Sequence, residues 1–357
     1  MVKNDKREIK QILLTLLSIP SPTGEEMAIL SWLEVFLSNL NFTTIWQSID
    51  EKRANLFAYR GKPNYLIATH VDTVPAWGHP YAFSPKCEGE IIWGRGAIDT
   101  KGQIAALLMA VKHSDIPCAL AFFVDEEKSG IGSEEFKPIF PFKGAIVLEP
   151  TNFTLAIFEA GSIEFSLKIN GKAAHGALPK RGRNAIDIFF EIYQKLKSLP
   201  LWQDSLFEGA GINIGKIEGG IDCQIVAETC EVEIDLPIFP GKTPEEVWKE
   251  IETILKQYPV SWEIKSFDPP WEISPKEKVV ELLAKSIEKE MPVRFSGMSA
   301  WTDAASLIQK GIPTVVFGAG DLAIAHTKEE KIDIKEVLKL FYILKNFLNK
   351  TLALDGD

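Results

Sequence analysis

The sequence lacks the features that mark secreted, membrane-spanning and nucleic-acid-binding proteins. It has only 4 cysteines in 357 residues and no C-x-x-C pair, which argues against a disulfide framework and a cysteine zinc site. Its longest apolar runs, 104–111 and 119–124, are far too short to span a bilayer. The formal charge of −10 and the absence of a basic patch argue against nucleic acid as a partner.

The N-terminus and the cysteines together predict a location. Residues 1–11 are polar and charged, unlike the apolar centre of a secretory signal. The cysteines are most simply free thiols in a reducing compartment. We therefore expect a cytoplasmic protein with neither a nucleic-acid nor a membrane partner.

The order of strand-like and helix-like segments predicts the domains. Strands and helices alternate up to about residue 160, which indicates an α/β sheet with helices on both faces. Residues 161–267 then read β-α-β-β-α-β, the ferredoxin-like order, before the α/β character returns. We therefore expect a catalytic domain of residues 1–160 and 268–357, interrupted by an inserted α+β domain of residues 161–267.

A capping signal precedes the second expected helix, which ends near Asn39. Thr23 is followed three residues later by Glu26, the spacing of a capping box. In that motif the threonine hydroxyl accepts a backbone N–H and the glutamate reaches back to the cap. We therefore expect Thr23 to cap this helix.

The chain has only five histidines, and several of them stand with acidic residues in short segments at the ends of apolar runs. Strand ends of α/β proteins are where side chains leave the core and meet a ligand. A cluster of His, Asp and Glu delivered from several strand ends is how a hydrolytic metal site is built. The side chains concerned are His70, Asp72, Asp99, Glu126, Glu127, Glu149 and His326.

Spacing suggests a role for each segment. In an extended chain residues two apart face the same side, so Asp72 can take the second N–H of a metal-bound His70. Residues 94–99 lack the third glycine of a dinucleotide fingerprint, and their glycines more simply shape a turn that presents Asp99. Of Glu126 and Glu127, one can bind metal while the other remains free to accept a proton.

Two coordination spheres follow from these side chains. One ion takes His70, Asp99 and Glu149, and the other takes Asp99, Glu127 and His326. Each sphere has nitrogen and oxygen ligands and leaves room for a water, as catalytic zinc requires. Two such ions share Asp99 and activate the attacking water, and Glu126 then takes its proton.

In chain order these segments resemble those of the di-zinc metallohydrolases that include acetylornithine deacetylase, succinyl-diaminopimelate desuccinylase, aminoacylase and glutamate carboxypeptidase. The resemblance covers nearly the whole chain. The matching text is T-H-V-D-T-V-P at 69–75, G-R-G-A-I-D-T-K-G at 94–102, D-E-E at 125–127, E-P-T at 149–151, A-A-H-G-A-L-P at 173–179, R-N-A-I at 183–186, W-T-D-A at 301–304, G-I-P-T-V-V-F-G-A-G at 311–320 and A-H-T at 325–327.

The resemblance implies the same ligands for two zinc ions, for which cobalt or manganese can substitute, with Glu126 as the base. It implies that the inserted domain forms a homodimer. His175 of that domain would reach the other subunit's site and support the oxyanion. The resemblance also implies a cis peptide bond between Asp99 and Thr100.

The chain departs from the family at one substrate-binding position. Many relatives carry Asp-x-Arg-x-x-Pro-Gly near the end of the inserted domain, where this chain has Pro237 in place of the arginine. We therefore expect Arg183, Asn184 or Arg294 to recognise the substrate carboxylate, or the substrate to differ.

The sequence thus predicts a zinc-dependent amidohydrolase of amino-acid biosynthesis. It would remove an N-acyl group, most simply acetyl, from a small amino acid such as ornithine or lysine. The alternative is a metallo-aminopeptidase, dipeptidase or carboxypeptidase acting on a short peptide. In an aminopeptidase, Asp303 or Asp321 could bind the free amine. The intact ligand set argues against an inactive scaffold, and the absence of G-x-S-x-G argues against a serine hydrolase.

Overall fold

The computed structural model describes residues 2–201, 207 and 211–352. The chain forms two compact units. The α/β unit consists of Met1–Ile157, Ile273–Ser296 and Thr302–Asp357, and the inserted unit of Phe158–Glu272 and Gly297–Trp301. The short second segment of the inserted unit lies outside the range expected from the sequence.

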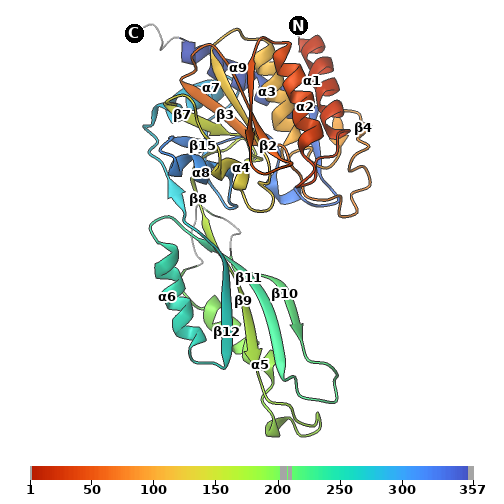
Figure 1. Ribbon diagram of the computed structural model, residues 1–357, viewed down its shortest axis with the longest axis vertical. Helices are drawn as coiled ribbons and strands as arrows, with labels where there is room; N and C mark the ends of the chain where they lie inside the picture. The colour runs from red at the N-terminus through yellow and green to blue at the C-terminus, as the bar shows by residue number, and fades with distance from the viewer. Residues whose placement is uncertain (1, 202–206, 208–210, 353–357) are drawn as a thin grey trace. The chain divides into compact units, whose positions relative to one another are not determined.

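A mixed sheet forms the centre of the α/β unit (Figure 1). Strands β6, β3, β7 and β15 are parallel neighbours, and β1, β2 and β8 extend the sheet in antiparallel pairings. All residues of β3 and β6 are buried, as in a sheet covered on both faces. Across the sheet the order is β1 (Thr43–Ser48), β2 (Ala54–Arg60), β6 (Cys118–Phe123), β3 (Tyr65–His70), β7 (Gly144–Val147), β15 (Thr314–Val316) and β8 (Leu155–Glu159).

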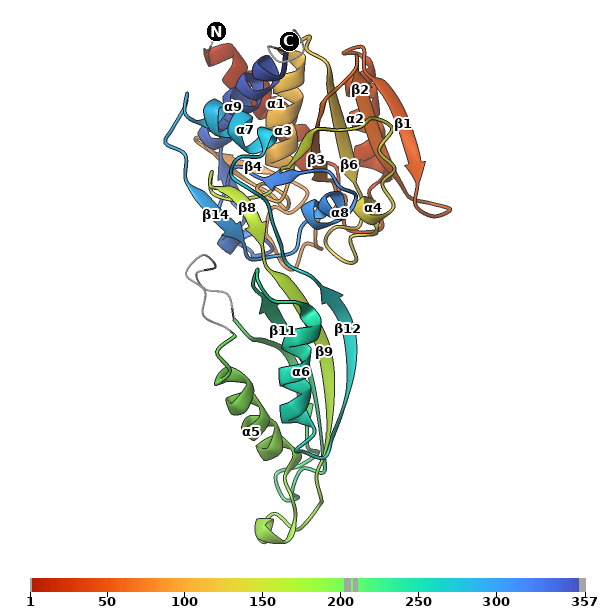
Figure 2. The ribbon, with the colours of Figure 1, turned by 90° about the vertical axis from the view of Figure 1, so that its left-hand side faces the viewer.

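Helices cover both faces of this sheet. Helices α1, α3, α7 and α9 pack on one another, as Figure 2 shows, while α2 contacts β1 and β2 and α8 contacts β7 and β15. Helix α3 is apolar on nearly every side and is buried accordingly. The helices are α1 (Val2–Leu17), α2 (Met27–Ser38), α3 (Lys101–Lys112), α4 (Ile131–Glu134), α7 (Lys278–Ile287), α8 (Asp303–Gln309), α9 (Ile334–Leu352) and the 3₁₀ turn η2 (Leu322–Ile324). A small sheet of β4 (Lys86–Glu88), β5 (Ile91–Trp93) and β16 (Lys331–Asp333) completes the unit.

The inserted unit is a four-stranded antiparallel sheet in the order β10-β11-β9-β12. Residues of β9 alternate between buried and more exposed, and α5 and α6 cover the buried face (Figure 2). This is the ferredoxin-like arrangement. The elements are β9 (Gly161–Asn170), η1 (Pro179–Arg181), α5 (Ala185–Lys197), β10 (Asn213–Gly219), β11 (Thr229–Ile238), α6 (Pro244–Leu255) and β12 (Val260–Asp268), with β13 (Trp271–Glu272) and β14 (Phe295–Met298) near the points where the chain changes unit.

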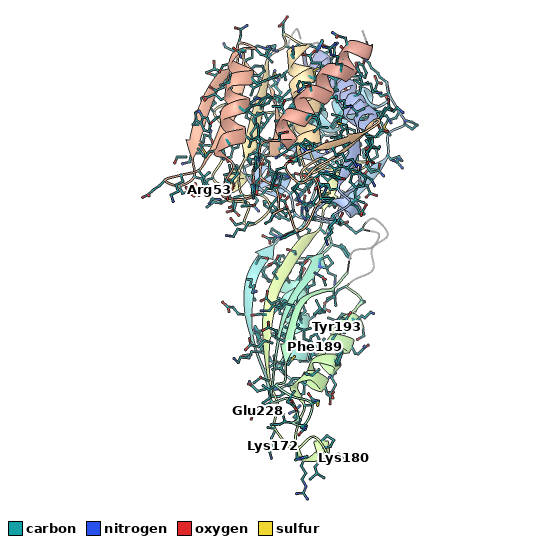
Figure 3. The ribbon with its side chains drawn as sticks, turned by 90° about the vertical axis from the view of Figure 1, so that its right-hand side faces the viewer. Arg53, Lys172, Lys180, Phe189, Tyr193 and Glu228 are labelled. Atoms are coloured by element: carbon teal, nitrogen blue, oxygen red, sulfur yellow. The ribbon has the colours of Figure 1, made fainter. Side chains whose placement is uncertain are left out.

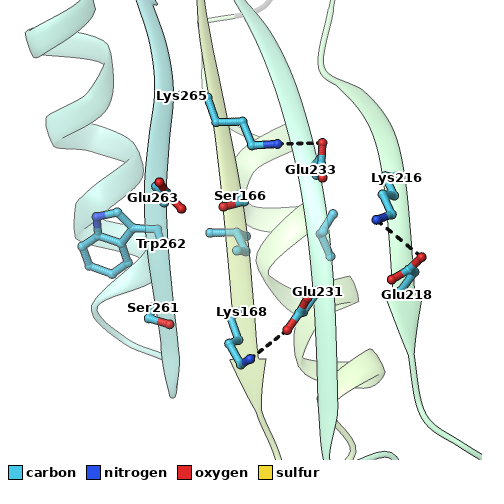
Figure 4. A pocket seen from close by; sticks show the side chains of 12 residues that line it. Ser166, Lys168, Lys216, Glu218, Glu231, Glu233, Ser261, Trp262, Glu263 and Lys265 are labelled. Atoms are coloured by element: carbon cyan, nitrogen blue, oxygen red, sulfur yellow. Dashed lines mark ion pairs between the residues drawn. The ribbon is translucent and has the colours of Figure 1, made fainter.

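The outer face of the inserted sheet carries charged side chains that pair with one another (Figure 4). Lys168 Nζ lies 2.8 Å from Glu231 Oε1, and Lys265 Nζ lies 2.7 Å from Glu233 Oε2. The opposite face is apolar, and Phe189 and Tyr193 of α5 stack there with ring centroids 6.1 Å apart (Figure 3). The unit therefore has one solvated face and one core face.

The structure confirms the predicted fold class, an α/β unit interrupted by a ferredoxin-like insertion. No helix in the described part of the chain is long and apolar enough to cross a membrane. The homodimer and the cytoplasmic location stay predictions.

Candidate active site

The candidate site lies where the parallel strands of the α/β unit end. Strand β3 ends at His70, and Asp72 follows it. Strand β6 leads into Glu126 and Glu127, and β7 leads into Glu149. Because β3, β6 and β7 are adjacent and parallel, their carboxyl ends meet at one edge and bring these side chains together.

The first group of possible metal ligands consists of His70, Asp99 and Glu149. His70 Nε2 lies 3.0 Å from Asp99 Oδ1 and 3.6 Å from Glu149 Oε1. All three side chains are buried. The structure thus brings together the first of the two predicted coordination spheres.

The second group consists of Asp99, Glu127 and His326. His326 Nε2 lies 2.9 Å from Glu127 Oε2 and 3.3 Å from Asp99 Oδ2. Asp99 therefore offers one oxygen to each group, as a carboxylate bridging two cations would. The peptide bond between Asp99 and Thr100 is cis, which agrees with what the resemblance implied.

The chemistry of these groups fits a pair of divalent cations. Glu149 Oε1 is buried and has no hydrogen-bond partner among the described residues. Burial raises the pKa of Glu149 to about 8, although the charge of His70 opposes this effect. A buried carboxylate in this condition is costly unless a cation binds it. Imidazole nitrogen and carboxylate oxygen are ligands of zinc, and the same set suits related divalent ions.

The surrounding carboxylates raise the pKa values of His70 and His326. Burial favours the neutral imidazole of His70, but the charges of Glu149 and Glu126 raise its pKa well above the ordinary value. Hydrogen bonds with Asp99 and Glu127 raise the pKa of His326 to about 10. The field of the site is therefore strongly negative and would favour the binding of cations.

Asp72 organises the site in more ways than the sequence predicted. His70 Nδ1 lies 3.0 Å from the backbone carbonyl of Asp72 and 3.4 Å from its carboxylate, so the carbonyl is the nearer acceptor. The carboxylate accepts the backbone N–H groups of Glu126 and Glu127, each at 3.2 Å. It also accepts the hydroxyl of Thr23 at 2.8 Å. Asp72 thus ties His70 to the loop that carries the proposed base.

The Thr23 capping box predicted from the sequence is wrong. Helix α2 begins at Met27, and its N-cap residue Glu26 makes no side-chain cap hydrogen bond. Glu26 Oε1 accepts the Gly24 N–H instead. The hydroxyl of Thr23 instead donates to the buried carboxylate of Asp72, and so serves the active-site loop.

Glu126 belongs to neither group of possible ligands. Burial raises its pKa well above the ordinary value, and the charges of Glu149 and Glu127 add to this effect. A carboxyl group that is near the ligands, is not itself a ligand and has a raised pKa is suited to general acid–base work. The structure is consistent with the role predicted for Glu126.

A buried ion pair that the sequence did not reveal supports the site. Arg95 Nη1 binds Glu330 Oε2 at 2.5 Å, and both side chains are buried. Arg95 Nη2 also donates to the carbonyl of His326, and Glu330 Oε1 accepts the Ile98 N–H. The pair therefore connects the loop that presents His326 with the turn that presents Asp99. We call Arg95 and Glu330 the buried clamp.

The candidates for binding a substrate amine do not fit that role. Asp303 is buried with no exposed surface, and burial raises its pKa to about 7. It therefore cannot meet an amine that arrives from solvent. Asp321 is exposed, but one of its carboxylate oxygens accepts the Ala323 N–H and caps η2. The structure gives no support to either residue as an amine-binding acid.

Three other predicted site residues lie in the inserted unit. His175 is exposed, in the loop between Lys172 and Lys180 at one end of that unit (Figure 3), and its Nδ1 accepts the Ala177 N–H. Arg183 pairs through its backbone with Lys172. The carboxamide oxygen of the third, Asn184, caps α5 by accepting the Ile186 N–H at 2.9 Å. Their roles towards substrate stay predictions.

Arg294 is the predicted carboxylate-binding residue of the α/β unit. It is exposed, and its Nη2 donates to the carbonyl of Asn152 at 3.3 Å. Arg294 therefore stays a candidate for recognising a carboxylate.

Comparisons with known proteins agree with this arrangement. Residues 66–350 match the family described as Peptidase family M20/M25/M40. A probable carboxypeptidase of Aspergillus clavatus is 28% identical over 95% of this chain and 88% of its own length. A tripeptidase from Staphylococcus aureus has the same fold, with a TM-score of 0.83, 22% identity and coverage of 98% and 99% of the two chains. An M20 family metallo-carboxypeptidase from Sulfolobus solfataricus also shares the fold, with a TM-score of 0.80, 17% identity and coverage of 96% and 98%.

Proposed function

The chain belongs to the Peptidase family M20/M25/M40, and from this membership we propose that it is a two-metal carboxypeptidase acting on short peptides. The observation that carries the two-metal part is Asp99, whose two oxygens face the two groups of possible ligands. The probable carboxypeptidase that matches nearly the whole chain supports the choice of substrate. The comparisons favour the peptidase alternative over the deacylase, which they do not support.

The residues of this chain have distinct tasks in the proposed reaction. Five side chains would hold the two cations, namely His70, Asp99, Glu149, Glu127 and His326. When bound, the cations polarise the scissile carbonyl and lower the pKa of the attacking water. Zinc, cobalt and manganese all suit this donor set, and zinc is our proposal.

Glu126 moves the proton in this proposal. It accepts a proton as water attacks the peptide carbonyl, and it delivers that proton to the amine nitrogen as the C–N bond breaks. Asp72 positions Glu126 by accepting its backbone N–H. We further propose that His175 supports the oxyanion from the other subunit of a homodimer.

The deacylase and the carboxypeptidase hydrolyse the same kind of bond. In both, the leaving group is an amino acid with a free α-carboxylate, and only the acyl side differs. An aminopeptidase instead requires a free amine on the acyl side. The test must therefore vary the two ends of the substrate separately.

We would give zinc- or cobalt-loaded protein four kinds of substrate. The first is an N-blocked dipeptide with a free carboxylate, the second the same dipeptide amidated at its C-terminus, the third the same dipeptide with a free amine, and the fourth a set of N-acetyl and N-succinyl amino acids. A carboxypeptidase cleaves the first and spares the second. Cleavage of the acyl amino acids alone would establish the deacylase, and a requirement for a free amine would establish an aminopeptidase.

A further inference from the structure

Trp77 is an exposed aromatic residue beside the candidate metal centre. Its side chain is 58% exposed, and its ring centroid lies 6.3 Å from that of His326, with the rings at 78° to each other. The side chain of His326 is itself 43% exposed, whereas that of His70 is buried. His326 and Trp77 therefore share the edge of the site that solvent, and hence a substrate, can reach.

The backbone at Trp77 is strained. The carbonyl of Ala76 accepts the His79 N–H at 2.8 Å, which closes a turn with φ of 39° at Trp77 and 77° at Gly78. Positive φ at both central residues is the pattern of a type I′ turn, in which glycine, asparagine and aspartate are usual. A bulky side chain in this region costs free energy and occurs mostly at functional sites. A turn with no other task would more readily contain glycine here.

The buried clamp holds this turn next to His326. Arg95 donates to the carbonyls of Pro75, Ala76 and His326, each at 3.2 Å. His79 Nε2 lies 2.9 Å from the carbonyl of Glu330. One ion pair thus fixes both the turn and the His326 loop, so the indole has a defined place relative to a possible metal ligand.

We propose that Trp77 is a specificity-determining residue, whose indole forms an apolar wall for the substrate side chain next to the scissile bond. The inference rests on the proposed peptidase function. A large, rigid aromatic group on the rim of a polar site favours aromatic and large aliphatic side chains, because it offers contact area at low entropic cost. The substrates it selects are short peptides with such a residue beside the cleaved bond, in preference to alanine or glycine.

The test compares Trp77→Gly and Trp77→Phe with the wild type on two N-blocked dipeptides. The dipeptides differ only in the residue on the acyl side of the scissile bond, which is phenylalanine in one and alanine in the other. Glycine accepts the positive φ, so the first variant removes the ring and relieves the strain. We expect the ratio of kcat/KM for phenylalanine over alanine to fall about tenfold in Trp77→Gly and to be largely kept in Trp77→Phe. Val35→Ala, which truncates a 63% exposed side chain on α2, should leave the ratio unchanged. An unchanged ratio in Trp77→Gly would overturn the proposal.

A binding measurement separates this proposal from the proposed function. Calorimetry of zinc-loaded protein with phenylalanine hydroxamate and alanine hydroxamate gives a ratio of dissociation constants without turnover. If the wild type cleaves no peptide, the peptidase proposal fails. The role of Trp77 still stands if the wild type prefers the phenylalanine compound and Trp77→Gly loses that preference. Equal weakening of both compounds would mean that Trp77 only supports His326, and would contradict the specificity role.

Discussion

The two units each gather acidic and basic side chains on β-strands, yet they do so in opposite ways. On the outer face of the inserted sheet, Lys168 and Glu231 are a pair whose side chains are 58% and 57% exposed. At the strand ends of the α/β unit, carboxylates outnumber cations and are buried, and a Glu149 oxygen has no hydrogen-bond partner among the described residues. The density of charge is therefore not the signal of a functional site. Burial without sufficient pairing is the signal, because its free-energy cost requires a compensating ligand.

The largest expected effect is a loss of turnover, and two neighbouring carboxylates, Glu126 and Glu127, should differ in whether metal is lost with it. We expect Glu126→Gln to lower kcat by about 10²- to 10⁴-fold, since it removes the proposed base. Its metal content should stay at the wild-type level, because Glu126 is in neither ligand group. Glu127→Gln is the matched variant and should lose metal as well as turnover. Turnover by Glu126→Gln at the wild-type rate would refute the assignment.

The next largest effect should be a loss of stability when the buried clamp is broken. Glu330→Gln leaves Arg95 buried without a counter-charge, which typically costs about 3–5 kcal/mol of unfolding free energy. The measurement is denaturant unfolding at pH 8, because burial raises the pKa of Glu330 to about 7 and the carboxylate must be ionised. Glu329→Gln is the control, since that side chain is 69% exposed. Equal midpoints for the two variants would show that the clamp contributes nothing.

The buried clamp could not be predicted from the sequence. Arg95 stands in the G-R-G-A segment, but its partner Glu330 lies 235 residues away, and no local pattern indicates the pairing. The strained φ of Trp77 is equally invisible, because the buried groups that hold it come from two distant loops. His70, Glu127 and Glu149 could be predicted because each follows an apolar run and parallel strands end at one edge. Asp99 could be predicted because the glycines before it indicate a turn. Periodicity likewise predicted the inserted unit.

Thr23 shows that a distant contact can also make a local prediction fail. Its spacing to Glu26 fitted a capping box, but the structure gives its hydroxyl to Asp72, 49 residues away. A local sequence pattern predicts an element correctly only when its side chains form no stronger hydrogen bond with a residue far away in the sequence. The buried carboxylates of the active site are such partners, so local predictions fail most readily beside them.

A pH dependence should appear in the metal-free protein. The pKa of Glu149 is about 8 in the fold because of burial, against 4.5 ordinarily, so between these values the folded state binds more protons than the unfolded state. Unfolding free energy must therefore fall as pH rises from about 5 to 8. His326, with a pKa of about 10 against 6.5, adds a decline of the same sign at higher pH.

Denaturant unfolding in EDTA at several pH values measures this decline. Glu149→Gln should make the decline below pH 8 shallower, because the amide does not titrate. Asp303 and Glu330, whose pKa values burial also raises to about 7, still contribute to the decline. Zinc should flatten the wild-type curve as well, since a bound cation stabilises the carboxylate form. A wild-type curve in EDTA that rises between pH 5 and 8 would contradict the account of Glu149 as a buried carboxyl group without sufficient pairing.

The smallest effect belongs to the exposed charges of the inserted sheet. Glu231→Gln removes one member of the pair with Lys168, but water solvates the lysine that remains, so little free energy is lost. We expect a change in melting temperature within experimental error and unchanged kcat/KM. The same glutamate-to-glutamine change at Glu330 should be strongly destabilising, so the two variants compare one chemical change in a solvated and a buried pair. A large loss of stability in Glu231→Gln would mean that this face is covered in solution, as it would be in an interface between copies of the chain.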